Sequence, residues 1–132
     1  MRTAIDTNVL LYLLDDGPKA ATARAILAEG GIISVQVLNE ITTVCRRKIG
    51  MGWDELRDLL GLVRERMTVV DLTEAVHDVG RALAERYQLS VYDAMIVASA
   101  LVNGCDRLLS EDMQDGLLIE GRLKIENPFA RG

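Results

Sequence analysis

The stretch Thr3-Ala4-Ile5-Asp6-Thr7-Asn8 decides the fold that the sequence predicts. A short apolar strand ends at Asp6, and the apolar residues 9–14 that follow (VLLYLL) predict a buried helix. In an open parallel sheet, residues just past the carboxyl ends of the strands face the crevice in which ligands bind. The opening of the chain therefore predicts an acidic side chain at that edge of a sheet.

Short strands alternate with helices along the rest of the chain. The expected strands are residues 32–33, 68–70, 107–110 and 123–125, and the expected helices are residues 18–28, 35–49, 53–67, 74–87 and 91–102. Pro18 suits a first helical turn, and Ser34, Thr73 and Ser90 can cap the helices that follow them. Helix 91–102 is apolar almost all round and is expected to be the most buried. The alternation predicts an α/β fold with a mostly parallel sheet covered on both faces, in a single domain of residues 1–132.

Composition restricts the class of protein. With 132 residues, 49% of them hydrophobic, the chain can form one domain with its own core. Its longest apolar run is about six residues, whereas a membrane-spanning helix needs about 20, and early acids argue against a signal peptide. Cys45 and Cys105 are expected to be buried thiols of a cytoplasmic protein, and a single histidine without Cys-x-x-Cys argues against structural zinc. The net charge of −5 does not suit a nucleic-acid binder unless the acids surround a cation.

Four acids occupy places from which they could meet at one edge of the sheet. Asp6 follows the first strand, and Glu40 lies in the helix after the second strand. Asp93 begins the apolar helix 91–102, and Asp112 follows strand 107–110. Asp115, three residues further on, is an additional candidate, whereas the neighbouring Glu111 is expected to point outward.

Three of these acids also have a purely structural explanation. Asp6 can cap the following helix, although Asn8 can fill that role instead. Asp93 stands three residues after Ser90, which is the spacing of a capping box. Asp112 suits an ordinary turn rich in Asp and Gly.

Glu40 has the weakest individual case. It lies roughly opposite the apolar stripe that helix 35–49 is expected to bury, so a solvated position is the simpler interpretation. Val37 and Val44, at i−3 and i+4, indicate that this side of the helix is not fully in water. The expected stripe consists of Val35, Leu38, Thr42, Cys45 and Ile49.

A cluster of four carboxylates would need protons or cations to persist. Two unit charges about 4 Å apart repel by about 4 kcal/mol at an effective dielectric of about 20. Oxygen ligands without His or Cys nearby favour Mg²⁺ or Mn²⁺ over zinc. Mg²⁺ held by carboxylates and water is suited to phosphoryl chemistry.

Four segments together resemble the PIN-domain family. They are residues 4–10 (AIDTNVL), 34–40 (SVQVLNE), 92–100 (YDAMIVASA) and 109–116 (LSEDMQDG), in the family's order and with its usual spacing. Within the family, the chain is similar to the VapC toxins of prokaryotic toxin–antitoxin pairs. The resemblance implies a three-layer α/β/α sandwich and a Mg²⁺- or Mn²⁺-dependent endoribonuclease.

The resemblance also implies roles for individual acids. The family's acidic quartet falls on Asp6, Glu40, Asp93 and Asp112, which would be both the metal ligands and the catalytic residues. In the implied mechanism of metal-assisted hydrolysis, the three aspartates hold the principal ion, and Glu40 completes the site or orients the attacking water.

Further implications concern the surroundings of the site. Asn8 and Ser110 occupy positions where the family has polar support, and Asp115 could supply an outer acid. The resemblance implies an RNA substrate, a homodimer, and a small VapB-like antitoxin whose extended C-terminal segment blocks the site. An Arg or Lys from that segment would pair with the acids.

Two other features are ambiguous. The run Arg46-Arg47-Lys48 could contact RNA phosphates, but cations at a helix C-terminus also favour the macrodipole. An apolar stripe on helix 53–67 is either core or a groove for a second copy or the antitoxin. This stripe consists of Trp53, Leu56, Leu59, Leu60 and Val63.

Two rival functions remain open. A phosphatase with Asp6 as nucleophile would need a second Asp two residues on, but that position is Asn8. A non-catalytic metal- or partner-binding domain, whose acids cap helices and hold water, predicts little dependence on divalent ions. In that case Asp93→Asn would cost only a lost cap, about 1 kcal/mol.

Overall fold

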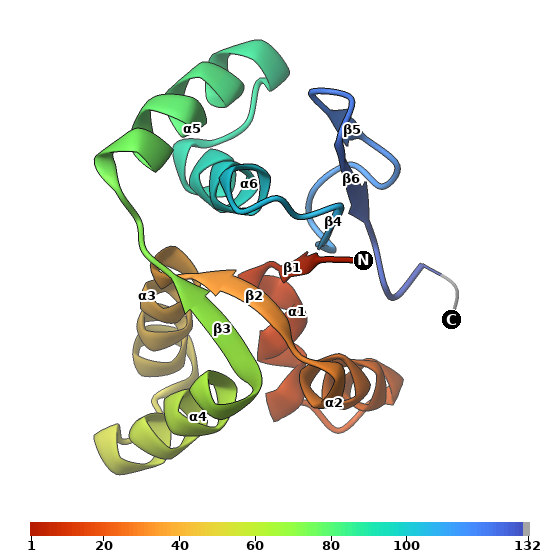
Figure 1. The fold of residues 1–132 in the computed structure, drawn as a ribbon. Coiled ribbons are helices and arrows are strands. Elements are labelled where there is room, and N and C mark those ends of the chain that lie inside the picture. Colours follow the sequence, from red (N-terminus) through yellow and green to blue (C-terminus); the bar gives the residue numbers. More distant parts are fainter. Residues whose placement is uncertain (131–132) are drawn as a thin grey trace.

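A six-stranded sheet runs through the middle of the computed structural model, which describes residues 1–130 (Figure 1). The strands are β1 (Thr3–Ile5), β2 (Gly31–Ser34), β3 (Met67–Val70), β4 (Arg107–Leu109), β5 (Leu118–Ile119) and β6 (Leu123–Glu126). Their order is β3-β2-β1-β4-β6-β5. Only β5 pairs antiparallel with its neighbour among the described strands, so the predicted mostly parallel sheet is confirmed. The last two residues of the predicted domain lie outside the described range.

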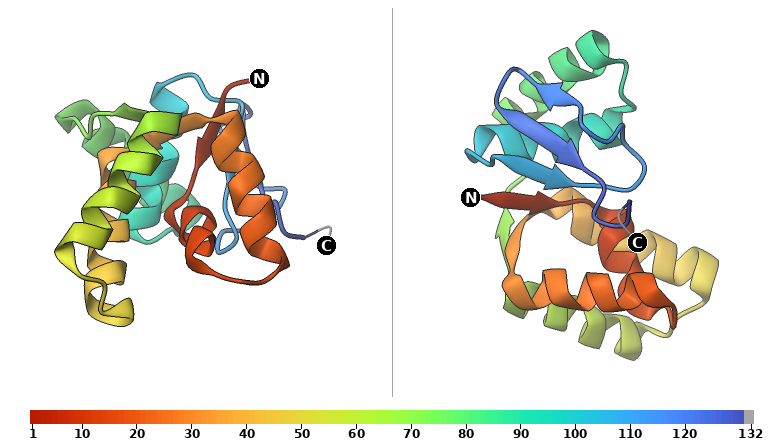
Figure 2. Two further views of the ribbon diagram at one scale, coloured as in Figure 1. Left: turned by 90° about the horizontal axis from the view of Figure 1, so that it is seen from below. Right: turned by 90° about the vertical axis from the view of Figure 1, so that its right-hand side faces the viewer.

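Helices cover both faces of this sheet. They are α1 (Thr7–Leu11), α2 (Pro18–Glu29), α3 (Val35–Val44), α4 (Trp53–Arg66), α5 (Glu74–Tyr87) and α6 (Val91–Val102). A 3-10 turn, η1 (Tyr12–Leu14), extends α1, and a π-helical turn, η2 (Cys45–Ile49), extends α3. The helices α5 and α6 lie on one side of the sheet and α1, α2 and α4 on the other, which confirms the three-layer sandwich (Figures 1 and 2).

The strand order places a topological switch beside β1. The chain steps outward from β1 to β2 and β3, then returns through α5 and α6 to β4 on the other side of β1. The two inner strands align Ala4 with Leu108, and the amide of Asp6 donates to the carbonyl oxygen of Leu109 over 2.9 Å. Crevices for ligands form at such switch points, at the carboxyl ends of the strands.

The helix α6 is held tightly against its neighbours. Residues 94–101 are all buried, which confirms the expectation that this is the most buried helix. Gly80 of α5 allows the close approach, because a Cβ atom there would lie 2.5 Å from Cε of Met95 and 3.3 Å from the carbonyl oxygen of Ala94. This packing fixes the start of α6, where Asp93 lies.

Most of the expected helix starts are confirmed. Pro18 is the first residue of α2. The hydroxyl of Thr73 accepts from the amide of Val76, and that of Ser90 accepts from the amide of Asp93. Cys45 and Cys105 are buried and free, as predicted.

Some local predictions were wrong. The apolar residues 9–14 do not form one buried helix: Val9 and Leu10 are buried, but the helix ends in the 3-10 turn and Leu14 is 39% exposed. Ser34 stands at the N-cap of α3 without a capping hydrogen bond from its side chain. The short β5 was not expected, because two residues carry no recognisable alternation.

The buried stripe of α3 also differs from the predicted one. Val37, Ile41 and Cys45 are buried, whereas Ile49 is 52% exposed. The helix is apolar on more than one side, so two stripes of helical spacing compete, and the contacts of α3 with α1 and α6 select the second. This turns Glu40 toward the protein rather than toward water.

Candidate active site

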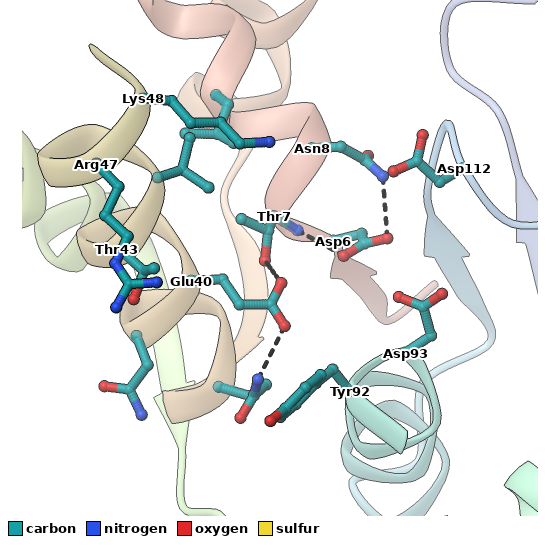
Figure 3. A pocket seen from close by; sticks show the side chains of 14 residues that line it. Asp6, Thr7, Asn8, Glu40, Thr43, Arg47, Lys48, Tyr92, Asp93 and Asp112 are labelled. Atoms are coloured by element: carbon teal, nitrogen blue, oxygen red, sulfur yellow. Dashed lines mark hydrogen bonds between the residues drawn. The ribbon is translucent and has the colours of Figure 1, made fainter. Parts of the chain in front are cut away.

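A pocket of about 800 Å³ opens at the carboxyl edge of the sheet, among α1, α3 and α6. Asp6, Glu40, Asp93 and Asp112 all line it, so the structure brings together the four acids that the sequence singled out (Figure 3). The other lining residues are Thr7, Asn8, Leu11, Gln36, Asn39, Thr43, Val44, Arg47, Lys48 and Tyr92.

Asp6 forms the floor of the pocket and is only 3% exposed. One carboxylate oxygen accepts from the amide of Thr7 at 2.7 Å, and the other accepts from the Ser110 hydroxyl at 2.7 Å and from Asn8 Nδ2 at 3.2 Å. Asp6 is therefore itself the N-cap of α1, and the alternative of Asn8 as the cap was wrong. Asn8 and Ser110 do support the carboxylate.

The environment of Asp6 disfavours its charge. Burial raises the pKa of this carboxyl from 3.8 to about 6, against the lowering effect of the bonds from Ser110 and Thr7. The negative charges of Asp93 and Glu40 raise the pKa further. These effects show that the acids lie within electrostatic range of one another.

Glu40 is fixed by two neutral donors. Its Oε1 accepts from the Thr7 hydroxyl at 2.7 Å, and its Oε2 accepts from Gln36 Nε2 at 2.8 Å. A solvated position for Glu40 was therefore the wrong interpretation. Sequence reasoning missed Thr7, although it directly follows Asp6, and missed Gln36, although its i, i+4 spacing to Glu40 was a usable signal.

Asp93 and Asp112 approach the pocket from the opposite side. Asp93 is half-buried in the first turn of α6, and its amide donates to the Ser90 hydroxyl that caps this helix. Burial raises the pKa of Asp93, with a lowering contribution from Ser90 and raising contributions from the charges of Glu40 and Asp112. Asp112 is exposed in the loop after β4.

The loop that carries Asp112 is tied down through its neighbour. Glu111 accepts from the Tyr12 hydroxyl at 2.6 Å and from Lys19 Nζ at 2.5 Å, and its amide donates to Asn8 Oδ1 at 3.1 Å. Glu111 does not line the pocket, as expected. It serves instead as a clamp between this loop and the α1–α2 region.

The remaining predicted site residues divide into two groups. Arg47 and Lys48 line the pocket, but Arg46 donates to the carbonyl oxygen of Met51 at 2.7 Å, and its guanidinium carbon lies 4.2 Å from the centre of the Trp53 ring. Asp115 accepts from the amide of Asn127 at 2.9 Å and is not a lining residue. The structure therefore does not bring Arg46 or Asp115 into the pocket.

The sequence matches the family model of the PIN domain over residues 3–114. The chain belongs to the PIN-domain family. The family resemblance of the four segments is thereby confirmed, and PIN-domain nucleases generally use divalent metal ions. No curated protein sequence matches the chain significantly.

Solved structures of VapC and VapBC proteins have the same fold. A toxin–antitoxin complex from Klebsiella pneumoniae has a TM-score of 0.71 and 20% identity, with 98% of each chain covered. VapC20 from Mycobacterium tuberculosis, a sarcin–ricin loop cleaving toxin, has a TM-score of 0.65 and 20% identity, covering 83% of this chain and 89% of that one. VapBC2 from Rickettsia felis, bound to a promoter DNA fragment, has a TM-score of 0.69 and 18% identity, covering 96% and 98%.

The carboxylates of this PIN domain suit a divalent ion chemically but stand apart. Within residues 1–130, no three His, Cys, Asp or Glu side chains are close enough to hold one ion together. Like charges repel in the absence of a counterion. The all-oxygen donor set fits Mg²⁺ or Mn²⁺. Burial is the main cause of the raised pKa values of Asp6 and Asp93, and the charges of the neighbouring acids, which a cation would offset, raise these pKa values further.

In the part of the chain from residue 1 to residue 130, no helix combines the length and apolar character needed to cross a membrane.

Proposed function

We propose that this chain, as a single domain of residues 1–132, is a Mg²⁺- or Mn²⁺-dependent endoribonuclease and the toxin of a VapBC-type toxin–antitoxin pair. One observation carries the proposal: four acids from four separate segments line one pocket at the switch point of a PIN fold. Burial with a raised pKa at Asp6 adds weight, since such perturbed acids cluster at functional sites.

Each side chain has a role in this proposal. Asp6, Asp93 and Asp112 would hold the ion, which supplies an activated water and stabilises the leaving oxygen when bound. Glu40 completes the site or orients the water, and the bonds from Thr7 and Gln36 keep its carboxylate in place for either task. Attack by water leaves a 5′-phosphate and a 3′-hydroxyl.

Two sets of neighbouring residues support the acids. Ser110, which directly follows β4, and Asn8 of α1 hold the Asp6 carboxylate, so that it keeps its orientation when the pocket is charged. Arg47 and Lys48, on the wall formed by η2, would neutralise phosphates of the RNA strand. Arg46 has a weaker claim to this role, because its guanidinium is engaged with Met51 and Trp53.

The proposed partners follow from the fold neighbours and from charge. Two of the neighbours above were solved as toxin–antitoxin assemblies. We propose a small VapB-like antitoxin that places an Arg or Lys against the four acids, together with a homodimer of this chain.

The decisive experiment is cleavage of a mixed RNA pool by the purified protein with Mg²⁺, Mn²⁺ or EDTA. Asp93→Asn should abolish cleavage while the protein stays folded, because the Ser90 cap is made to the backbone amide. Asp78→Asn, an exposed acid on α5, is the matched control and should cut like the wild type. Equal cutting by both variants, or cutting in EDTA, would contradict the proposal.

A non-catalytic binding domain is the second candidate. It is favoured by one observation, namely that the described residues contain no ready-made group of three metal-binding side chains. This alternative predicts no cleavage of any RNA and no stabilisation by divalent ions. A phosphatase is disfavoured, because Asn8 in the place of the second acid is already bonded to Asp6 and to the amide of Glu111.

A further inference from the structure

We propose that Tyr92 binds substrate, its ring stacking on the base of an unpaired nucleotide beside the bond that is cut. The inference deepens the proposed ribonuclease function and rests on it. It assigns a role to a lining residue for which the metal chemistry has no use.

Tyr92 is unusual in its surroundings. It is the second residue of α6 and is 65% exposed, although residues 94–101 of the same helix are all buried. It lines the pocket next to Asp93, and within residues 1–130 its hydroxyl makes no hydrogen bond. Large aromatic rings usually supply buried area to a core or an interface. The ring of Tyr92 contributes little to this core, so its apolar face is available to a ligand.

The position of the ring fits a nucleotide chain. Figure 3 shows Tyr92 approaching from α6 while Arg47 and Lys48 approach from η2, with Glu40 between them in this view. An RNA strand that crosses the pocket would place phosphates near the two cations and near the acids, with bases between these phosphates. An aromatic ring at the edge of the acids would meet one of these bases.

The chemistry of stacking restricts the substrate. Every base has a π-face, so a stacking ring adds affinity with little preference for sequence. A base inside a duplex already stacks on its neighbours and pairs with its partner, so it is not free for the ring without a cost. Tyr92 therefore favours RNA that is unpaired at the cleaved bond and leaves base identity to other contacts.

Three substitutions separate stacking from other roles of the side chain. Tyr92→Phe keeps the ring and removes the hydroxyl, Tyr92→Leu keeps an apolar side chain without the ring, and Tyr92→Ala removes both. Stacking predicts that Phe retains function and that Leu and Ala lose it by about 5- to 150-fold in kcat/KM, mainly through KM. Because Tyr92 is mostly exposed, all three should fold. Val102→Ala, at an exposed apolar position near the other end of α6, is the matched control.

The test combines cleavage with a direct signal of stacking. A short single-stranded RNA carrying 2-aminopurine is titrated with the full-chain protein in EDTA, and cleavage of the same RNA and of its duplex is measured with Mg²⁺. We expect wild type, Tyr92→Phe and Val102→Ala to quench the fluorescence and to prefer the single strand. Tyr92→Ala should do neither.

The outcomes distinguish this inference from the function on which it rests. If the wild type cuts RNA and Tyr92→Ala cuts single strand and duplex with unchanged kcat/KM, the stacking role is refuted while the ribonuclease stands. Loss in Tyr92→Phe equal to that in Tyr92→Ala would replace stacking by a role of the hydroxyl and also overturn the inference. If the folded wild type neither binds nor cuts RNA, the ribonuclease proposal fails and this inference fails with it.

Discussion

Replacing Asp6 by Asn should make the metal-free protein more stable at pH 8. Asp6 is 3% exposed, and burial raises its pKa from 3.8 to about 6. A carboxyl whose pKa is higher in the folded than in the unfolded state stabilises the fold at a pH below 3.8, and this contribution is lost as the pH rises through about 6. Between these two pH limits, the contribution of the Asp6 carboxyl to the free energy of unfolding falls by about 3 kcal/mol. An uncharged Asn avoids this loss.

The hydrogen bonds of Asp6 reduce the gain. In the variant, the Thr7 amide keeps its acceptor, and the Ser110 hydroxyl can rotate to accept from the new amide. Asn8 Nδ2, however, would face the new NH₂ group of Asn at position 6, which is also a donor. Flipping the Asn8 side-chain amide would not help, because its oxygen already accepts from the amide of Glu111. One lost bond costs about 1 kcal/mol. Asp6→Asn should therefore be about 2 kcal/mol more stable than the wild type at pH 8, and this difference should vanish at about pH 4.

Urea unfolding followed by circular dichroism, in EDTA at both pH values, measures this difference. Asp71→Asn, an exposed acid between β3 and α5, is the control for simple charge removal and should change little at either pH. Added Mg²⁺ should stabilise the wild type but not Asp6→Asn, because only a ligand that binds the folded state raises its stability. An Asp6→Asn protein no more stable than wild type at pH 8 would refute the argument that burial holds this carboxyl at a raised pKa.

Three further predictions concern the support of the site. Ser110→Ala removes a donor to a buried carboxylate, so the pKa of Asp6 should rise above about 6, as a carbon-detected NMR titration would show, and stability above that pH should fall by about 1.5–3 kcal/mol. Lys19→Met removes the partner of Glu111, so cleavage should fall while the midpoint of urea unfolding changes little, because the ion pair is exposed; unchanged cleavage would show that the clamp does not position the loop. Gly80→Ala adds a Cβ 2.5 Å from the Met95 methyl and 3.3 Å from the Ala94 carbonyl oxygen of α6, so unfolding should become easier by about 1–3 kcal/mol, and an unchanged midpoint would show that the Met95 side chain moves aside without cost.

The parts of the site that the sequence predicted are those governed by local rules. Asp6 and Asp112 follow short apolar strands, and parallel strands bring their carboxyl ends to one edge. Asp93 was placed correctly because Ser90 caps α6 and the apolar run after it is long. In each case the neighbours in sequence are sufficient to locate the residue.

The outcomes for Glu40, Arg46 and Asp115 depend on which partners the helix face or the side chain finds in the folded protein. Glu40 faces the pocket because α3 buries Val37 and Ile41, a choice that its contacts with α1 and α6 make. Arg46 and Asp115 have the right residue types, but a carbonyl and an aromatic ring capture the first, and the amide of Asn127 captures the second. Such competition between partners is not visible in a pattern of residue types.

The apolar stripe predicted on helix 53–67 is only partly core, because one of its residues finds a partner at the surface. Leu56 and Val63 are buried in the core, and Leu59 and Leu60 pack against it in part. Trp53 is 58% exposed and stacks with Arg46 instead. The stripe is therefore mostly core, and only its first residue lies on the surface.

The charge pattern around the pocket leads to one more conclusion. Within residues 1–130, none of the four pocket acids forms an ion pair, whereas the adjacent Glu111 has Lys19 as its partner outside the pocket. Asp6 and Glu40 are held by hydroxyls, amides and a backbone N–H, which orient a carboxylate without neutralising it. A fold selected for stability alone would pair such half-buried acids with cations or replace them by apolar residues, whereas Arg47 and Lys48, which line the same pocket, form no ion pair with them. The arrangement keeps oriented, uncompensated negative charge at the cost of stability, as expected for a site completed by a cation from outside the chain.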